Sequence, residues 1–281
     1  MKEINCKKVR EEMLTEAKEK LKNIHRKLKL VVIQVEGDQA SGIYIRNKLR
    51  TCEAVGVDCE IVELPTDIPI FKLADILSDC NKNDKADGII LQLPLPRHLE
   101  KYQSDLINMI DWRKDVDGLT DINVSKLWTG KDGIRPATAE AVMRLLPDDL
   151  SGKSATIFGR SDLVGKPLIK LLMDQNATVS VCHSKSDIYT KYSLIDHSDI
   201  VISAIGKPKE LVLTPYSFFN KSTFIDVGIN RDENGKICGD FLIGPNSGDK
   251  CEYTPVPGGV GILTTAQLVL NLIKCYELRH I

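Results

Sequence analysis

The stretch SATIFGRSDLVGKPLIKLL, residues 154–172, decides the fold of the C-terminal half of the chain. Ser154–Phe158 has the composition of a buried strand, and Leu163–Met173 has the apolar spacing of a helix. The loop between them contains Gly159 and Gly165, so its backbone N–H groups can face a pyrophosphate at the start of that helix. The pattern departs from G-x-G-x-x-G in its second glycine and in the position of its last one. An ordinary strand-to-helix turn is therefore the alternative.

The residues after the next strand bear on the choice of dinucleotide. Ala177–Cys182 is expected to be this strand, and no acidic residue follows it before Asp187. NAD-binding domains commonly place an acid here to hold the ribose 2′-hydroxyl. Arg160, Ser184 and Lys185 could instead hold a 2′-phosphate, which favours NADP over NAD. The alternative is that His183 and Lys185 are solvated loop residues.

Strands and helices alternate along the whole chain. Further strands are expected at Leu28–Val35, Cys59–Leu64, Gly88–Leu93, Ile200–Ala204 and Thr223–Gly228, and further helices at Ser41–Val55, Phe71–Asn81 and Ile262–Tyr276. This alternation predicts parallel sheets covered by helices, with a Rossmann-like series in the C-terminal half. We therefore predict an α/β protein of two domains with a cleft between them. The catalytic domain spans 1–137 and is completed by the helix in 262–281, and a Rossmann-like NADP-binding domain spans 138–261.

Composition excludes several classes of function. Lys plus Arg (38) and Asp plus Glu (39) nearly balance in the 281 residues, so no electrostatic footprint for nucleic acid or an acidic membrane is present. No apolar run approaches the roughly 20 residues that span a bilayer, and the charged N-terminus lacks a signal-peptide core. We expect a cytoplasmic protein whose eight cysteines are reduced. Cys182, His183 and Cys238 do not have metal-ligand spacing, so no metal is predicted.

Five polar residues in the N-terminal half are candidates for chemistry. Tyr44 and Lys48 share one face of a predicted helix, although such a pair is more often solvated. They resemble the Tyr-x-x-x-Lys pair of short-chain dehydrogenases but precede the glycine loop, which argues against that class. Gln92 interrupts an apolar strand, where a buried amide needs partners, and a satisfied core glutamine is the alternative. Asp115 and Asp117 flank a turn before glycine, which indicates either an Asx-type turn or a carboxylate presented to a heterocycle.

Taken together and in order, these segments resemble the bifunctional methylenetetrahydrofolate dehydrogenase/cyclohydrolase family. The matching pieces are S-x-x-Y-I-R-N-K from Ser41, GIILQLPLP from Gly88, KDVDGL from Lys114, GRSDLVGKP from Gly159, ATVSVCHSKS from Ala177, DIVISAIG from Asp199, FIDVGIN from Phe224 and TPVPGGVG from Thr254. Each piece alone is weak, whereas the ordered set is specific and spans nearly the whole chain.

The resemblance implies roles for the matching positions. Lys48 would be the catalytic lysine, and Gln92 would hydrogen-bond it. Tyr44 would pack against the folate, and Asp117 would grip the pterin ring. The other substrate contacts that it implies are Leu93, Pro257, Gly258, Gly259 and Val260. The NADP contacts that it implies are Gly159, Arg160, Ser161, Val164, Gly165, His183, Ser184 and Ile229.

The resemblance also implies an activity in one-carbon metabolism. The chain would oxidise 5,10-methylenetetrahydrofolate with NADP⁺ and hydrolyse the methenyl product to 10-formyltetrahydrofolate. A dehydrogenase with weak or absent cyclohydrolase activity is the alternative. A shikimate-type dehydrogenase is disfavoured by the QLPLP and PGGVG segments, and a binding protein without catalysis by the intact set of polar residues. Partners would be tetrahydrofolate derivatives and a second copy of the chain in a homodimer, with no nucleic acid or membrane.

Overall fold

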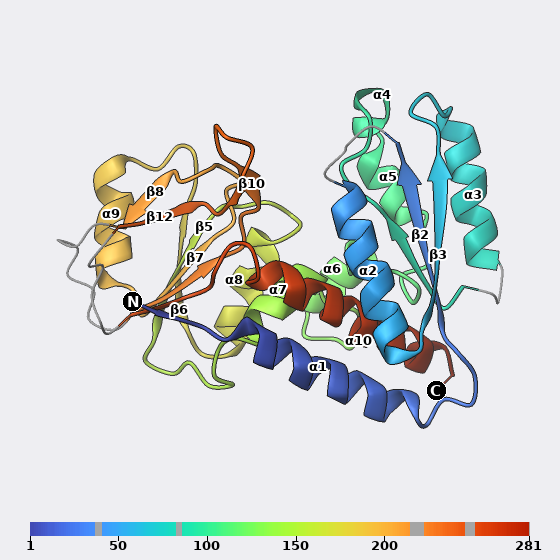
Figure 1. Ribbon diagram of the computed structural model, residues 1–281, viewed down its shortest axis with the longest axis horizontal. Helices are drawn as coiled ribbons and strands as arrows, with labels where there is room; N and C mark the ends of the chain where they lie inside the picture. Colours follow the sequence, from blue (N-terminus) through green and yellow to red (C-terminus); the bar gives the residue numbers. More distant parts are fainter. Residues whose placement is uncertain (37–40, 83–85, 214–221, 245–250, 281) are drawn as a thin grey trace. The chain divides into compact units, whose positions relative to one another are not determined.

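The computed structural model describes residues 1–36, 41–82, 86–213, 222–244 and 251–280, with the backbone alone for 41–44 (Figure 1). The chain forms two compact units. We call the first the glycine-loop unit; it comprises Met1–Glu11 and Thr138–Thr264. We call the second the lysine unit; it comprises Glu12–Ala137 and Thr265–Ile281.

An all-parallel, six-stranded sheet forms the centre of the glycine-loop unit (Figure 1). Its strands, in spatial order, are β1 (Lys2–Glu3), β13 (Glu252–Tyr253), β9 (Thr223–Asp226), β7 (Ile200–Ser203), β5 (Ser154–Phe158) and β6 (Thr178–Cys182). All four residues of β7 are buried, as expected of a parallel strand covered on both faces. The predicted Rossmann-like class is thus confirmed.

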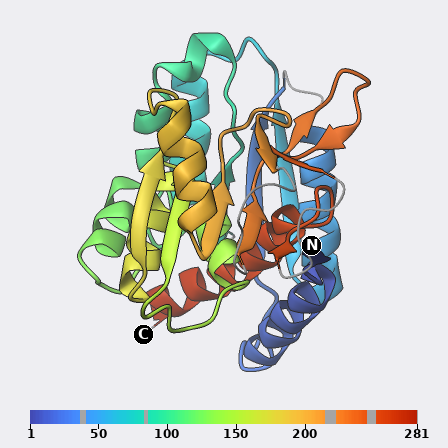
Figure 2. The same cartoon turned by 90° about the vertical axis from the view of Figure 1, so that its left-hand side faces the viewer.

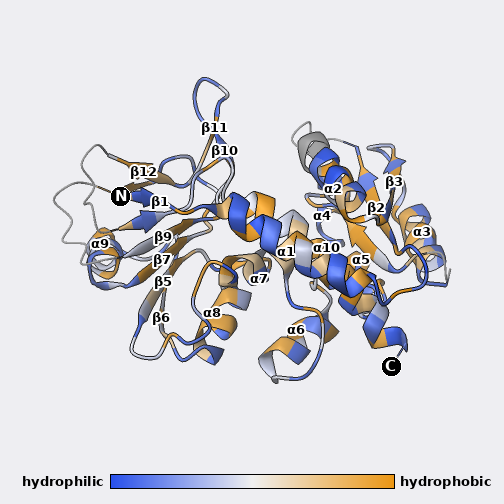
Figure 3. Ribbon diagram, turned by 60° about the horizontal axis from the view of Figure 1, so that its bottom comes forward, coloured by the Kyte–Doolittle hydropathy of each residue, from blue (hydrophilic) through white to orange (hydrophobic). Residues whose placement is uncertain are grey.

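The chain reverses direction across this sheet between β5 and β7. From β5 it passes through helix α8 (Gly165–Asp174) to β6 on one side, and then through α9 (Ile188–His197) to β7 on the other. The two helices lie on opposite faces of the sheet (Figures 1 and 3), and Figure 2 shows α9 in front of it. Ligands of doubly wound sheets bind at the carboxyl edge where this reversal occurs. A ligand site is therefore expected at the carboxyl ends of β5 and β7.

The first residues of the chain belong to the glycine-loop unit, whereas we predicted 1–137 as one domain. The Lys2 N–H donates to the Cys251 carbonyl and the Ile4 N–H to the Tyr253 carbonyl, each at 2.8 Å, which adds β1 to the sheet edge. Two charged residues carry no strand signal, so this pairing is visible only in the fold. Helix α1 (Cys6–Leu21) follows. The unit also contains the parallel pair β8 (Leu211–Leu213) and β12 (Phe241–Ile243) and the hairpin β10 (Asn230–Arg231) and β11 (Ile237–Cys238).

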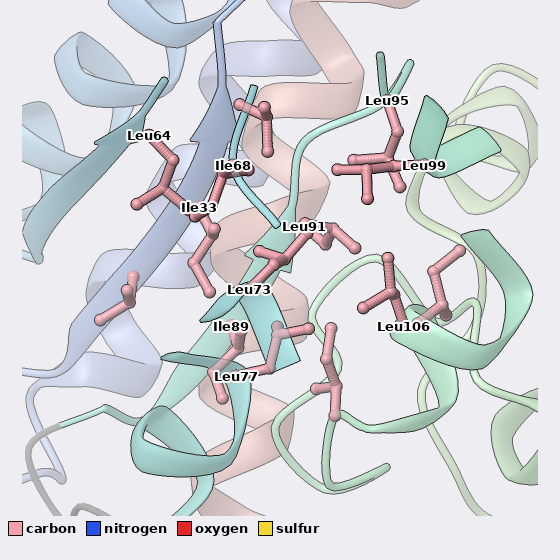
Figure 4. Packing of buried hydrophobic residues seen from close by; sticks show 14 of the residues in the cluster. Ile33, Leu64, Ile68, Leu73, Leu77, Ile89, Leu91, Leu95, Leu99 and Leu106 are labelled. Atoms are coloured by element: carbon pink, nitrogen blue, oxygen red, sulfur yellow. The ribbon is translucent and has the colours of Figure 1, made fainter. Parts of the chain in front are cut away.

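The lysine unit is built on a three-stranded parallel sheet in the order β3-β2-β4. Its elements are β2 (Lys29–Val35), α2 (Ser41–Val55), β3 (Asp58–Leu64), α3 (Ile70–Lys82), β4 (Gly88–Leu91), α4 (Arg97–Glu100), α5 (Gln103–Asn108) and α6 (Asp121–Trp128). Ile33 and Ile89 from the sheet and Leu73 and Leu77 from α3 are fully buried in one cluster (Figure 4). This apolar packing fixes the strand whose end carries Gln92.

Helix α10 (Val260–His280) supplies the lysine unit from Thr265 onward, and short helix α7 (Ala137–Met143) starts where the units divide. Asn271 donates from Nδ2 to the Val116 carbonyl at 2.8 Å, and Arg279 Nη2 lies 2.9 Å from Asp87 Oδ1. A side chain at Gly88 would meet Leu272 Cδ1 at 2.6 Å, so glycine lets the helix approach β4. Within the described part of the chain, none of the helices combines the length and apolarity that a bilayer crossing requires.

Candidate active site

Lys48 and Gln92 are joined by a hydrogen bond. Lys48, half-buried on α2, donates from Nζ to Gln92 Oε1 at 2.8 Å. Gln92 in turn donates from Nε2 to the Leu93 carbonyl at 2.7 Å, which orients the amide oxygen toward the lysine. We predicted Gln92 inside a strand, but β4 ends at Leu91, one residue earlier. The Gln92 N–H still bonds the Ile33 carbonyl at 2.8 Å, so the sheet positions this side chain.

The surroundings of Lys48 favour its neutral form. Burial lowers the pKa of Lys48, and the nearby Asp117 carboxylate opposes this shift only in part. The hydrogen-bonded partner, Gln92, is a neutral amide that does not hold the proton by charge. A lysine of this kind can take a proton from water and release it again.

The two acids of the KDVDGL turn have different tasks. Asp115 is buried, and its carboxylate accepts hydrogen bonds from the Gly118 N–H (2.9 Å), the Thr120 N–H (2.7 Å) and Asn123 Nδ2 (3.0 Å). Asp115 therefore shapes the turn. No hydrogen bond reaches the Asp117 carboxylate from residues that the structure describes, and burial raises its pKa while Lys48 lowers it. Asp117 is the acid available to a ligand.

The other predicted substrate contacts are spread over both units. Tyr44 falls on helix α2, but its side chain lies outside the described residues. Leu93 packs partly against the core cluster of the lysine unit. Pro257, Gly258, Gly259 and Val260 belong to the glycine-loop unit, at the start of α10. Gly258 has a φ of +98°, and a side chain at Gly259 would collide with the Pro255 carbonyl, so this turn requires both glycines.

A cavity of about 270 Å³ opens at the carboxyl ends of β5 and β7 in the glycine-loop unit. It is lined by Phe158, Gly159, Arg160, Ser161, Cys182, His183, Ser184, Lys191, Ala204, Ile205, Lys207, Glu210 and Leu211. Gly159 has a φ of +118°, and a side chain there would lie 2.5 Å from the Ala204 carbonyl oxygen. A side chain at Gly165 would meet the Gly159 carbonyl oxygen at the same distance. The two glycines thus let the loop, α8 and the end of β7 pack closely.

Five of the predicted dinucleotide contacts line this cavity: Gly159, Arg160, Ser161, His183 and Ser184. Val164 and Gly165 lie instead at the start of α8, where the Val164 N–H donates to Ser161 Oγ at 3.3 Å. Ile229 is exposed and is not part of the cavity lining. Lys185 also lies outside it; it is exposed, and its N–H donates to His183 Nδ1 at 3.2 Å.

The charge of the cavity suits an anionic ligand. Besides Arg160 it contains Lys191 and Lys207, which the sequence analysis did not single out, against a single acid, Glu210. Asp187, the first acid after β6, caps α9 by accepting the Thr190 N–H at 3.0 Å, so helix capping accounts for its carboxylate. The donor set therefore fits a dinucleotide that carries a 2′-phosphate.

The helical spacing from the Asp187 cap could have identified Lys191, which lies one turn further along α9. Lys207 comes from a loop and carried no such signal. For metal ions, no group of three or more His, Cys, Asp or Glu side chains is suitably arranged among the described residues.

Two family models match the chain in succession. The tetrahydrofolate dehydrogenase/cyclohydrolase catalytic domain matches residues 4–117, and the NAD(P)-binding domain of the same family matches residues 136–280. Among curated relatives, the bifunctional protein FolD of Campylobacter hominis is 42% identical over 249 residues, covering 87% of this chain and 85% of the relative. The Clostridium novyi protein of the same name is 37% identical over 278 residues, covering 96% and 98%.

Solved structures of methylenetetrahydrofolate dehydrogenase/cyclohydrolases also match the fold of this chain. The FolD methylenetetrahydrofolate dehydrogenase/cyclohydrolase of Campylobacter jejuni superposes with a TM-score of 0.89 at 36% identity and covers 98% of both chains. The Trypanosoma brucei enzyme, solved with NADP cofactor and an inhibitor, superposes with a TM-score of 0.89 at 29% identity over 99% of this chain and 98% of that one. This chain therefore belongs to the tetrahydrofolate dehydrogenase/cyclohydrolase family.

Proposed function

We propose that this chain oxidises 5,10-methylenetetrahydrofolate with NADP⁺ and hydrolyses the resulting methenyl compound to 10-formyltetrahydrofolate. The observation that carries the proposal is the half-buried Lys48, whose ammonium is held by a neutral amide and whose pKa is lowered by burial. Family membership and the bifunctional relatives support both activities. The Lys48–Gln92 pair accounts for the second activity in particular, because hydrolysis needs a group that moves protons.

The oxidation makes modest demands on the protein. The lone pair of a folate nitrogen stabilises the cation as the methylene bridge loses hydride, so no strong base is required. Bound NADP⁺ supplies the hydride acceptor. The chain's part is to bind and align the reactants. Arg160 and Ser184 would hold the 2′-phosphate, Gly159 would let the pyrophosphate approach the loop backbone, and the cationic lining supports NADP over NAD.

In hydrolysis of the methenyl compound, Lys48 would be the proton-transfer group. Water attacks the methenyl carbon, a carbon–oxygen bond forms, and one carbon–nitrogen bond breaks to leave the formyl group. Neutral Lys48 would accept one proton of the attacking water and return it to the departing ring nitrogen, and the second water proton is released to solvent as the formyl carbonyl forms. Gln92 holds the amine in place without charge, and a cationic substrate lowers the pKa of Lys48 further.

Asp117, Tyr44 and the turn from Pro257 to Val260 would recognise the folate. The Asp117 carboxylate would accept hydrogen bonds from the N–H groups of the pterin ring, since the Asp115 carboxylate, and not that of Asp117, accepts the N–H groups of the turn. Tyr44 would pack against the rings as the family resemblance implies. The turn from Pro257 to Val260 in the glycine-loop unit is proposed to contribute backbone contacts, as the family resemblance implies, and the space beside Gly258 is open.

Two further properties belong to the proposal. All eight cysteines are free thiols, and six of them are buried, which suits the reducing cytoplasm. The family resemblance also suggests a homodimer. Light scattering of the purified chain measures its mass directly, and a monomeric mass at working concentrations would contradict the dimer.

One spectrophotometric experiment tests the function. Methylenetetrahydrofolate is mixed with NADP⁺ or with NAD⁺, and formation and decay of the methenyl product are followed by absorbance. We expect formation with a clear preference for NADP⁺, and enzyme-dependent decay to the formyl product. Formation without accelerated decay identifies a dehydrogenase that lacks cyclohydrolase activity. Absence of product with either dinucleotide contradicts the whole proposal.

A further inference from the structure

A fully buried carboxylate, Asp240, stands behind the cavity of the glycine-loop unit, and none of the chemistry above involves it. It lies between β11 and β12. It accepts four hydrogen bonds, from Ser203 Oγ (2.8 Å), the Ile205 N–H (2.9 Å), the Lys207 N–H (3.0 Å) and Asn230 Nδ2 (2.8 Å). Each carboxylate oxygen takes two of them, so the group is saturated with neutral donors.

Two of these donors, the N–H groups of Ile205 and Lys207, belong to residues that line the cavity. Ser203 ends strand β7, and the chain then turns through Ile205 to Lys207, both of which line the cavity. Gly206, between Ile205 and Lys207, has a φ of +65°, a backbone conformation that favours glycine. The loop conformation is therefore set by this glycine and by the hydrogen bonds of the two neighbouring N–H groups. Asp240 thereby ties this loop to the end of β7.

A second carboxylate holds Asp240 itself. Asp226, at the end of β9, accepts the Asp240 N–H at 3.0 Å and the Phe241 N–H at 2.9 Å. Side chains at Gly228 and Gly239 would collide with the carboxylates of Asp240 and Asp226 respectively. The two buried acids are therefore packed closely against Gly228 and Gly239, and the hydrogen bonds to Asp240 restrict its movement.

We propose that Asp240 is a positioning residue for NADP: it fixes the loop from Ala204 to Lys207 as one wall of the cavity that receives the 2′-phosphorylated adenosine. The inference rests on the proposed function, because NADP is taken as the ligand. The Lys207 N–H is anchored at 3.0 Å, so the backbone of Lys207, which lines the cavity together with Arg160 and Lys191, is fixed. A preorganised wall lowers the ordering cost of binding.

The test is binding of 2′,5′-ADP, a probe with the 2′-phosphate but without nicotinamide, to the full chain by calorimetry. Asp240→Asn leaves an amide N–H₂ facing backbone N–H groups, and Ser203→Ala removes one donor more gently. Asp199→Asn is the matched control. Asp199 lies at the opposite end of β7, where it accepts the Ser154 N–H at 2.9 Å and pairs with Lys153, away from the cavity.

We expect Asp240→Asn to weaken 2′,5′-ADP binding about tenfold, the equivalent of one lost charged hydrogen bond. Ser203→Ala should weaken it about threefold, and Asp199→Asn less than about twofold, since neutral bonds and remote sites contribute less. In turnover, Asp240→Asn should raise the KM for NADP⁺ and leave kcat and the KM for the folate nearly unchanged.

Unchanged 2′,5′-ADP affinity in Asp240→Asn overturns the proposal, as does an equal loss in Asp199→Asn, which would indicate general destabilisation. If Asp240→Asn does not fold, Ser203→Ala decides, and wild-type affinity in that variant overturns the proposal. A wild-type chain that binds the probe but shows no folate turnover would contradict the proposed function and leave this inference standing.

Discussion

Lys48 Nζ lies 2.8 Å from Gln92 Oε1, so the partner of the candidate catalytic amine is an uncharged amide. A carboxylate at that position would make an ion pair and hold the lysine protonated. The amide instead orients the amine and leaves its charge to be set by burial, which lowers the pKa of Lys48, and by Asp117, which raises it. The chemistry proposed for this chain depends on that balance.

The pH profile of hydrolysis should respond to the charge at position 92. Because neutral Lys48 is the active form, the cyclohydrolase rate should rise with pH through the lowered pKa of Lys48. Gln92→Glu places a negatively charged carboxylate beside the amine, which raises the pKa of Lys48. The rise of the cyclohydrolase rate should therefore move to higher pH. Rates of methenyl decay measured across pH test this. An unshifted profile in Gln92→Glu would exclude Lys48 as the titrating group.

We expect Asp117 to act in folate binding and Asp115 to stabilise the turn. Asp117→Asn should raise the KM for the folate about tenfold or more, since a charged hydrogen bond to the pterin is lost. It should leave the melting temperature unchanged or higher, because burial disfavours the Asp117 charge. Asp115→Asn should instead lower the free energy of unfolding by about 1–3 kcal/mol, since one of the two acceptor oxygens becomes an N–H₂ donor that faces a donor of the turn. The reverse pattern would refute the assignment.

The preference for NADP⁺ should depend on Arg160. Arg160→Ala should reduce kcat/KM for NADP⁺ by about tenfold to a hundredfold and change that for NAD⁺ little, because only the 2′-phosphate loses a partner. Lys185→Ala is the control, since Lys185 is exposed and outside the cavity lining. Kinetics with both dinucleotides measure the ratio. Equal losses for NADP⁺ and NAD⁺ would show that Arg160 contacts another part of the cofactor.

Helix α10 should stabilise the lysine unit through Asp87. Burial alone would raise the pKa of Asp87, but hydrogen bonds from Arg26, the Lys29 N–H and Arg279 outweigh it and leave the pKa lowered. The stabilisation is thus present above the unfolded pKa and is lost as pH falls through the folded one. Arg279→Ala should cost about 1–3 kcal/mol at neutral pH.

Arg279→Ala should also move acid destabilisation to higher pH, because the pKa of Asp87 then rises. Chemical denaturation at several pH values measures both effects. Lys274→Ala is the control on the same helix, because it breaks only an exposed pair with Asp132 and should change stability by less than about 1 kcal/mol. Equal free energies of unfolding in Arg279→Ala and Lys274→Ala would show that the buried Arg279–Asp87 pair stabilises the chain no more than the exposed pair does.

The order of strands and helices could be read from the sequence because apolar runs and helical spacing are local signals. Strands β2, β3 and β5 and helices α2 and α8 were each predicted within one or two residues of their ends. The glycine loop was also identifiable, because the strand and helix that flank it are adjacent in sequence.

Features that depend on tertiary contacts were not predictable in this way. Strand β1 exists only because β13 offers its edge, and Lys2–Glu3 has no strand composition of its own. The Lys48–Gln92 contact joins residues 44 positions apart, and only the family resemblance suggested it. Lys207 and Asp240 likewise come together through a hydrogen bond between separate loops.

The most direct test of the account is hydrolysis of methenyltetrahydrofolate by Lys48→Met. This variant keeps the apolar bulk of the side chain and removes the amine, so the chain should fold and bind 2′,5′-ADP as the wild type does. We predict that enzyme-dependent decay of the methenyl compound disappears. Decay at the wild-type rate in a folded, probe-binding Lys48→Met protein would contradict the claim that this amine moves the protons.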